Sequence, residues 1–185
     1  MGKTNIAVNL AVGLAQAGQR VLLFDADLGL ANVDIALGLK PEFDVQHVIS
    51  GERRLDEILM DGPEGIRIIP AASGVARMAS LSSTEQAGLV HAFSELALPV
   101  DTLIVDTGAG IDNTVLTFTA ACQEVLVVIC DEPTSLTDAY ALIKLMNRDY
   151  GTNRFRILAN QVRNEQEGRH LFEKLTRVTE RFLDV

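Results

Sequence analysis

The chain has few aromatic side chains and little positive charge. Its 185 residues include seven Phe, two Tyr and no Trp, so the interior has to be built mainly from Leu, Val, Ile and Ala, which is typical of buried parallel sheets. Lys and Arg number 16 against 25 Asp and Glu, a formal net charge of −9, and no Lys/Arg run is dense enough to suggest a nucleic-acid stripe. The composition therefore disfavours non-specific DNA binding, and we expect no nucleic-acid partner.

Cysteines and long apolar runs are also scarce. The two cysteines, Cys122 and Cys130, form no Cys-x-x-Cys pair, so we expect buried reduced thiols and neither a zinc site nor an iron–sulfur cluster. No apolar run approaches the length of a membrane span. The three histidines, His47, His91 and His170, lie far apart in the sequence and form no metal-ligand pattern. We therefore expect them to be surface or core residues and not catalytic ones.

The chain does contain a regular alternation of strand-length apolar runs and segments with helical periodicity. This alternation predicts an α/β fold with a mainly parallel sheet covered by helices on both faces, in one domain over residues 1–185. The apolar runs predict strands at 21–25, 66–70, 101–106, 125–130 and 155–160. The periodic segments predict helices at 4–17, 82–97, 113–121, 135–148 and 165–183, with short helical pieces between 29 and 61.

The segment Gly2-Lys3-Thr4 stands directly before an apolar stripe at helical spacing. Gly-Lys-Thr at a helix start is the second half of a P-loop, in which backbone N–H groups and the helix N-terminus hold phosphate oxygens, Lys3 neutralises them and the Thr4 hydroxyl ligates Mg²⁺. A solvated surface lysine is the alternative, because three residues recur by chance.

The first half of such a loop, and the strand that feeds it, would lie upstream of Met1. We therefore expect a chain that is incomplete at both ends and that shows no measurable ATPase activity as residues 1–185 alone. Without that strand, the strands at 101–106 and 125–130 should pair with each other, recruit another chain or stay partly unfolded, because their backbone groups need partners.

Acidic side chains follow two of the predicted strands. Asp25 and Asp27 come at the end of the strand at 21–25, and Asp106 ends the strand at 101–106, before a loop of small residues. Open α/β sheets bind ligands at the carboxyl ends of their strands. One of the first two carboxylates could face a metal and the other an attacking water, while Asp106 fits a Walker B pattern that holds Mg²⁺ through water. The alternatives are a helix N-cap for the first pair and a turn aspartate for Asp106.

Two later strand ends also carry polar residues. Asn160 ends the last predicted strand, where its amide could recognise an adenine edge, although a turn asparagine is equally common. The loop Asp131-Glu132-Pro133-Thr134-Ser135 follows the strand at 125–130, and we interpret Thr134 or Ser135 as the cap of the next helix.

Together, these motifs resemble the MinD/ParA class of deviant-Walker ATPases over essentially all 185 residues. The segments 2–11, 25–34, 131–135 and 137–145 are most similar to the flagellar-number regulator branch, called FleN or FlhG. The resemblance implies a three-layer P-loop NTPase fold with a mainly parallel sheet, from which the first central strand is missing here. Gly108 stands where this family often has Ala or Pro, and the family's first P-loop lysine has no counterpart in the chain.

The resemblance also implies roles for individual residues. Lys3 and Asp27 would be catalytic, with Asp27 orienting the hydrolytic water. ATP would be bound by Gly2, Lys3, Thr4, Asn5 and Asn160, the last reading adenine. Mg²⁺ would be held by Thr4, Asp25 and Asp106.

For the whole protein, the resemblance implies an ATP-driven homodimer that hydrolysis resets to monomers. It further implies a cytoplasmic location, peripheral membrane docking through a C-terminal helix beyond Val185, and binding to a flagellar GTPase and a flagellar transcriptional activator. The alternatives are an ATPase-inactive remnant that binds a partner, and a MinD-like cell-division or ParA-like partition ATPase. The acidic balance and the flagellar-branch segments disfavour the ParA type, since non-specific DNA affinity grows from basic residues.

Overall fold

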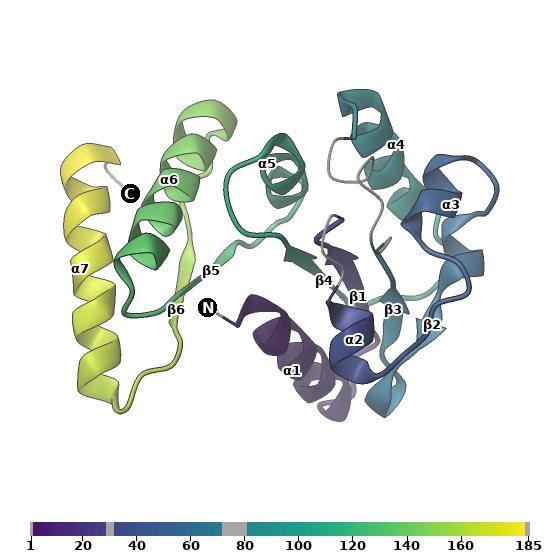
Figure 1. Ribbon diagram of the computed structural model, residues 1–185, viewed down its shortest axis with the longest axis horizontal. Coiled ribbons are helices and arrows are strands. Elements are labelled where there is room, and N and C mark those ends of the chain that lie inside the picture. The colour runs from purple at the N-terminus through teal and green to yellow at the C-terminus, as the bar shows by residue number, and fades with distance from the viewer. Residues whose placement is uncertain (1, 29–31, 72–80, 184–185) are drawn as a thin grey trace. The chain divides into compact units, whose positions relative to one another are not determined.

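The computed structural model describes residues 2–28, 32–71 and 81–183, with side chains in these ranges up to residue 180. Helices and strands alternate along the chain (Figure 1). The chain divides into two compact units. The N-terminal unit is Lys3–Gly108, and the C-terminal unit consists of Ala109–Val185 together with Gly2.

The N-terminal unit is built on a four-stranded sheet in the order β2-β3-β1-β4. Its strands are β1 (Val21–Ala26), β2 (Met60–Asp61), β3 (Arg67–Ile69) and β4 (Thr102–Thr107). β1 pairs in parallel with both β3 and β4, and β2 pairs antiparallel with β3. The predicted α/β fold with a mainly parallel sheet is therefore confirmed. β2 was not predicted, because two residues are too few to show an alternation.

Helices of several lengths connect these strands. They are α1 (Lys3–Gln16), α2 (Val33–Leu37), α3 (Val45–Ile49) and α4 (Ser83–Ser94), with the 3₁₀ turns η1 (Leu55–Ile58) and η2 (Pro63–Gly65). The short helical pieces expected between 29 and 61 are present in the described part of that range, while 29–31 lie outside the described residues. Gly38 ends α2 in the left-handed conformation, and Ser82 caps α4 through a capping box with Glu85.

Helices cover both faces of this sheet. Ala7 and Ala11 of α1 pack with Val21 and Leu23 of β1 in one buried cluster. Side chains alternate along a strand, so Phe24 of β1 points to the opposite face, where its ring lies 5.2 Å from that of Phe93 in α4. The N-terminal unit thus has three layers, with α1 and α4 on either side of the sheet.

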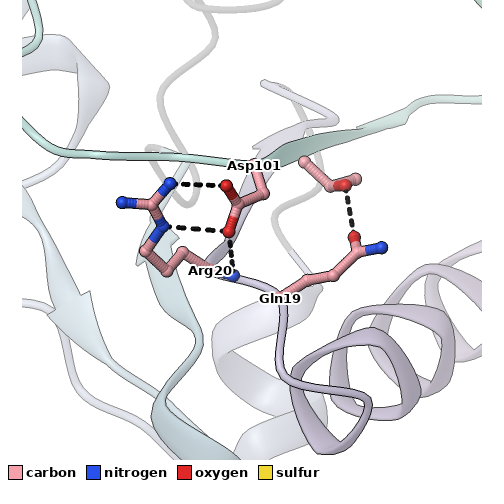
Figure 2. Close-up of polar contacts among 4 residues, drawn as sticks. Gln19, Arg20 and Asp101 are labelled. Carbon is pink, nitrogen blue, oxygen red and sulfur yellow. Dashed lines mark hydrogen bonds and ion pairs between the residues drawn. The ribbon is translucent and has the colours of Figure 1, made fainter.

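An ion pair ties together the amino ends of β1 and β4, the end opposite to the predicted site. Arg20 donates hydrogen bonds to the Asp101 carboxylate (Figure 2). Its Nε lies 2.9 Å and its backbone nitrogen 2.8 Å from Oδ2 of Asp101. The Arg20 hydrogen bond holds the pKa of Asp101 well below its usual range. Next to this pair, the Thr102 hydroxyl donates to Gln19 Oε1 at 2.7 Å. These contacts fix the alignment of two strands that are distant in the sequence.

The C-terminal unit has a smaller parallel sheet of β5 (Leu126–Ile129) and β6 (Arg156–Ala159). Its helices are α5 (Asn113–Ala120), α6 (Pro133–Tyr150) and α7 (Glu165–Leu183). The core of this unit is a cluster from β5, α6 and α7, made of Val127, Ile129, Ala139, Ile143, Leu171 and Leu175.

The start of α6 differs from the prediction. The helix begins at Pro133 with Glu132 as its N-cap, so the assignment of Thr134 or Ser135 as the cap is wrong. Proline is favoured in the first turn because its fixed φ suits the helix and it has no N–H to leave unpaired. Ser135 is buried instead, and its Oγ accepts a hydrogen bond from the backbone nitrogen of Cys130 at 3.0 Å.

The two strands expected to lack a central neighbour do not pair with each other in the described structure. β4 pairs with β1 alone and β5 pairs with β6 alone, so each is the edge strand of its own sheet among the described residues. Both cysteines are free thiols, with Cys130 buried and Cys122 partly buried. Over the described ranges, we find no helix with the length and apolarity needed to cross a bilayer.

Candidate functional site

The first turn of α1 presents Lys3 and Thr4 at the positive end of a helix. The turn contains no acidic residue, so nothing in it offsets the positive end of the helix dipole. Both residues are half-buried, whereas Asn5 is exposed and its carbonyl accepts a hydrogen bond from Asn9 Nδ2 at 2.7 Å. A helix terminus of this kind attracts anionic groups, and Lys3 adds a full positive charge to it.

Asp106 lies near the carboxyl end of β4 and is only 4% exposed. Burial raises its pKa, while a hydrogen bond from the Thr4 side chain and the charge of Lys3 act in the opposite direction. The start of α1 therefore lies beside the carboxyl end of β4. In the described structure, the Oδ2 atom of Asp106 is buried without a hydrogen-bond partner. A buried carboxylate oxygen with no donor is costly, and such an oxygen is suited to facing a cation or a water molecule.

Asp25 occupies the position on β1 that pairs with Asp106 on β4. Its oxygens accept three backbone hydrogen bonds, from Asp27 to Oδ1 at 3.1 Å and from Asn32 and Val33 to Oδ2 at 2.9 and 3.0 Å. Burial raises the pKa of Asp25 to about 6, and the three N–H donors limit the rise. The carboxylate thus organises the segment that follows β1.

Asp27 lies against the loop after β4. A Cβ atom built on Gly108 would stand 3.4 Å from Asp27 Cγ, so the two residues are in van der Waals range. The charge of Asp27 also raises the pKa of Asp106, which places both carboxylates in one electrostatic environment. Lys3 is the positive charge that acts on this environment.

These residues fit a magnesium ion that is bound together with phosphate. Mg²⁺ keeps several waters and takes one or two protein oxygens plus phosphates, in preference to an all-protein cage. Thr4 offers a hydroxyl, and Asp106 offers an oxygen that lacks a donor. Within the described ranges, no three His, Cys, Asp or Glu residues form a group that could hold a metal unaided.

Asn160 belongs to the C-terminal unit, where it follows β6 and donates its backbone N–H to Ile129 at 2.8 Å. Its Nδ2 atom would lie 3.0 Å from a Cβ atom placed on Gly2. Gly2 also has φ of +78°, a conformation that L side chains rarely adopt. A side chain at position 2 would therefore strain the backbone and crowd the Asn160 amide.

The N-terminal unit brings together four of the residues predicted from the sequence, Lys3, Thr4, Asp27 and Asp106, and places Asp25 directly beside them. Their roles with ATP and Mg²⁺ stay predictions, as do those of Gly2, Asn5 and Asn160. Residue types could not reveal the amide donors that surround Asp25, because every residue except proline has a backbone N–H.

Comparison with known proteins identifies the family of the chain. The model of the CbiA family, described as the CobQ/CobB/MinD/ParA nucleotide binding domain, matches residues 1–185. The chain is 59% identical over its whole length to the antiactivator FleN of Pseudomonas aeruginosa, covering 66% of that protein. It is 36% identical to the flagellum site-determining protein YlxH of Helicobacter pylori, over 96% of the chain and 60% of YlxH.

A solved structure shows the same fold. The septum site-determining protein MinD of Pyrococcus horikoshii, complexed with Mg-ADP, superposes with a TM-score of 0.75 at 23% identity, over 96% of this chain and 72% of that one. The chain spans about two thirds of FleN and three fifths of YlxH. With the whole sequence matched and the P-loop NTPase fold shared, the chain belongs to the CobQ/CobB/MinD/ParA nucleotide-binding domain family.

Proposed function

We propose that this protein is a molecular switch that binds and hydrolyses ATP, dimerises when ATP is bound and regulates the number or placement of flagella. The observation that carries the nucleotide part is the buried Oδ2 of Asp106, which has no donor among the described residues and lies in a carboxylate next to Thr4 and Lys3. A bound Mg²⁺ would neutralise the phosphate charge at this place.

Each residue of the N-terminal unit has a distinct part in this proposal. The Lys3 ammonium and the first turn of α1 bind phosphate oxygens, and the Thr4 hydroxyl faces the metal. Asp106 holds the metal through a water molecule. Asp27 orients the attacking water, which would make its carboxylate more important for turnover than for binding.

Similarity to YlxH supports the flagellar part of the proposal, because YlxH is named a flagellum site-determining protein, and similarity to the antiactivator FleN supports a regulatory role. On this basis the partners would be a second copy of the protein, a flagellar GTPase and a flagellar transcriptional activator. The protein would act in the cytoplasm and at the inner face of the membrane. The net charge of −9 gives no support to a DNA-bound partition role.

The test compares wild-type protein, expressed from its complete gene, with Asp27→Asn and Lys3→Ala. Titration with ATP and Mg²⁺ should show that Asp27→Asn keeps the wild-type affinity within about threefold while turnover falls by about 100-fold or more. Lys3→Ala should lose affinity itself, because it removes the charge that binds phosphate. Lys40→Ala, which removes an exposed lysine of the same unit, is the matched control and should leave both unchanged.

Wild-type protein that neither binds nor hydrolyses ATP would refute the nucleotide switch. Equal losses of affinity and turnover in Asp27→Asn would refute the water-orienting role alone. For the cellular part, a strain without the gene should carry an altered number of flagella, restored by the wild-type gene and not by Asp27→Asn. A normal flagellar number combined with a cell-division or plasmid-partition defect would favour the MinD-like or ParA-like alternatives.

A further inference from the structure

The two buried carboxylates of the site differ in what surrounds their oxygens. Asp25 is 1% exposed and accepts three backbone N–H groups, whereas Asp106 has one buried oxygen with no donor among the described residues. A carboxylate offers about four lone-pair positions. Asp25 already uses three of them, including two on Oδ2, and its near-complete burial leaves little access to the fourth.

The three donors belong to two places along the chain, one directly after β1 and one at the start of α2. Asp27 is two residues beyond Asp25, and its N–H points to Oδ1. Asn32 and Val33 stand at the N-cap and first residue of α2, and both donate to Oδ2. One side chain therefore fixes the backbone at Asp27 and at the entry to α2 simultaneously.

A second contact constrains the side chain of Asp27. Its carboxylate lies against Gly108 on the loop after β4, with 3.4 Å between Asp27 Cγ and an added Cβ. If the backbone moved at Asp27, its carboxylate would shift relative to Gly108 and the loop after β4. Since displacements of about 1 Å are enough to reduce catalysis strongly, the hydrogen bond that the Asp27 N–H donates to Asp25 matters for the reaction geometry.

We propose that Asp25 is a positioning residue that holds Asp27 and the start of α2, and that it is not part of the Mg²⁺ shell. The proposal rests on the proposed function for the role of Asp27 in turnover. Asp106 and Thr4 then remain as the protein groups that face the metal.

The structural arm of the test measures amide hydrogen exchange in residues 1–185 without nucleotide or Mg²⁺. In Asp25→Asn, the side-chain carbonyl oxygen can still accept the two hydrogen bonds that Oδ2 accepts in the wild type. The new NH₂ group replaces Oδ1 and cannot accept the hydrogen bond from the Asp27 N–H. Exchange at Asp27 should therefore rise about tenfold or more, while Asn32 and Val33 change less than about threefold. Asp25→Ala should release all three amides.

Asp34→Asn is the matched control. Asp34 is also buried, and its Oδ1 accepts a backbone N–H from Ile35 at 2.8 Å, so the substitution makes the same chemical change nearby without touching Asp27. If Asp25→Ala does not fold, Asp25→Asn still decides the question. Unchanged exchange at Asp27 in Asp25→Asn would overturn the proposal, because the hydrogen bond would then have no positioning effect.

The functional arm uses the protein expressed from its complete gene. Asp25→Asn should lower kcat about tenfold or more with KM within about threefold, and the Mg²⁺ concentration that half-saturates ATP binding should stay within about threefold. The double variant with Asp27→Asn should turn over no more slowly than Asp27→Asn alone, since Asp25 acts through Asp27. A purely structural weakening would add to the loss.

Each remaining outcome is decisive. A tenfold shift in the Mg²⁺ requirement of Asp25→Asn would return Asp25 to the metal shell and refute the proposal. A further loss of turnover in the double variant would also refute it, because Asp25 would then act independently of Asp27. If the wild-type protein shows no turnover, the proposed function fails, and the exchange measurements alone confirm or refute the positioning role.

Discussion

Asp25 and Asp106 are paired neighbours on adjacent parallel strands, and their buried carboxylates are stabilised in different ways. The oxygens of Asp25 receive backbone N–H groups, whereas Oδ2 of Asp106 has no donor in the described structure. Burial raises the pKa of both side chains. The pair combines a carboxylate that accepts three backbone N–H groups with one whose buried Oδ2 accepts none among the described residues, and the stability of the chain should reflect the difference.

Replacing Asp106 with Asn should stabilise the Mg²⁺-free protein. The substitution removes a buried negative charge and retains an oxygen that can accept from Thr4, so the free energy of unfolding should rise by about 1 kcal/mol. For a chain of this length, this corresponds to an increase in Tm of roughly 2–4 °C. Thermal denaturation with and without Mg²⁺ and ATP measures it. The ligand-induced increase in Tm should be lost at the same time, and a variant that retains it would show that Asp106 does not face the metal.

The pH dependence of stability should carry the signature of Asp25. Its folded pKa of about 6 exceeds the unfolded value of 3.8, so the native state binds this proton more tightly. The stabilisation is complete below pH 3.8 and is lost as the pH rises to 6 and beyond, by up to about 3 kcal/mol. Chemical denaturation of the Mg²⁺-free wild type and of Asp25→Asn between pH 4 and 7 isolates this contribution as the difference between the two.

Asp101→Asn is the control, because the folded state shifts the pKa of Asp101 in the opposite direction to that of Asp25. Arg20 lowers the pKa of Asp101, so its stabilisation is present above pH 3.8 and is lost as the pH falls through the folded value. Between pH 4 and 7 the difference between wild type and Asp101→Asn should therefore stay near its full value and fall only in more acidic solution, whereas the difference for Asp25→Asn should fall as the pH rises. Parallel curves for wild type and Asp25→Asn would contradict the raised pKa of Asp25.

Gly2→Ala should weaken nucleotide binding. The new Cβ would stand 3.0 Å from Asn160 Nδ2, and the φ of +78° costs a non-glycine residue about 1–2 kcal/mol. Titration with ATP and Mg²⁺ should show a loss of affinity of roughly tenfold. Gly18→Ala carries a similar φ, +87°, with no atom within 4 Å of the added Cβ. It should lower stability and leave affinity unchanged, and equal affinity in both variants would refute the prediction.

Two other glycines should respond to alanine in opposite directions. Gly13 lies in α1 with open space around an added Cβ, so Gly13→Ala should stabilise the protein by about 0.5–1 kcal/mol. At Gly62, an added Cβ would approach Ile66 Cγ1 to 2.6 Å and Ile68 Cδ1 to 2.7 Å, so Gly62→Ala should destabilise by about 1–3 kcal/mol. Urea denaturation of the two variants checks both signs, and a destabilised Gly13→Ala would contradict the helix argument.

Local features of the fold could be read from the sequence because they depend on neighbouring residues. The capping box of Ser82 and Glu85, the glycine that ends α2 and the alternation of apolar strands with periodic helices are all set within a few positions. The helix start at Pro133 was misplaced by two residues, since Thr134 and Ser135 are equally good capping residues in sequence, and proline decided the boundary.

The sequence by itself placed Lys3 and Thr4 at the start of a helix and Asp27 and Asp106 at the ends of strands, and these positions made the four residues candidates. Only the tertiary structure decided that Thr4 contacts Asp106, because that contact depends on the pairing of β1 with β4 and on the packing of α1 against this sheet. It also decided that Asp25 faces backbone amides. The donors lie only two, seven and eight positions beyond Asp25, but every residue except proline has a backbone N–H, so residue type does not show which amides a carboxylate will meet.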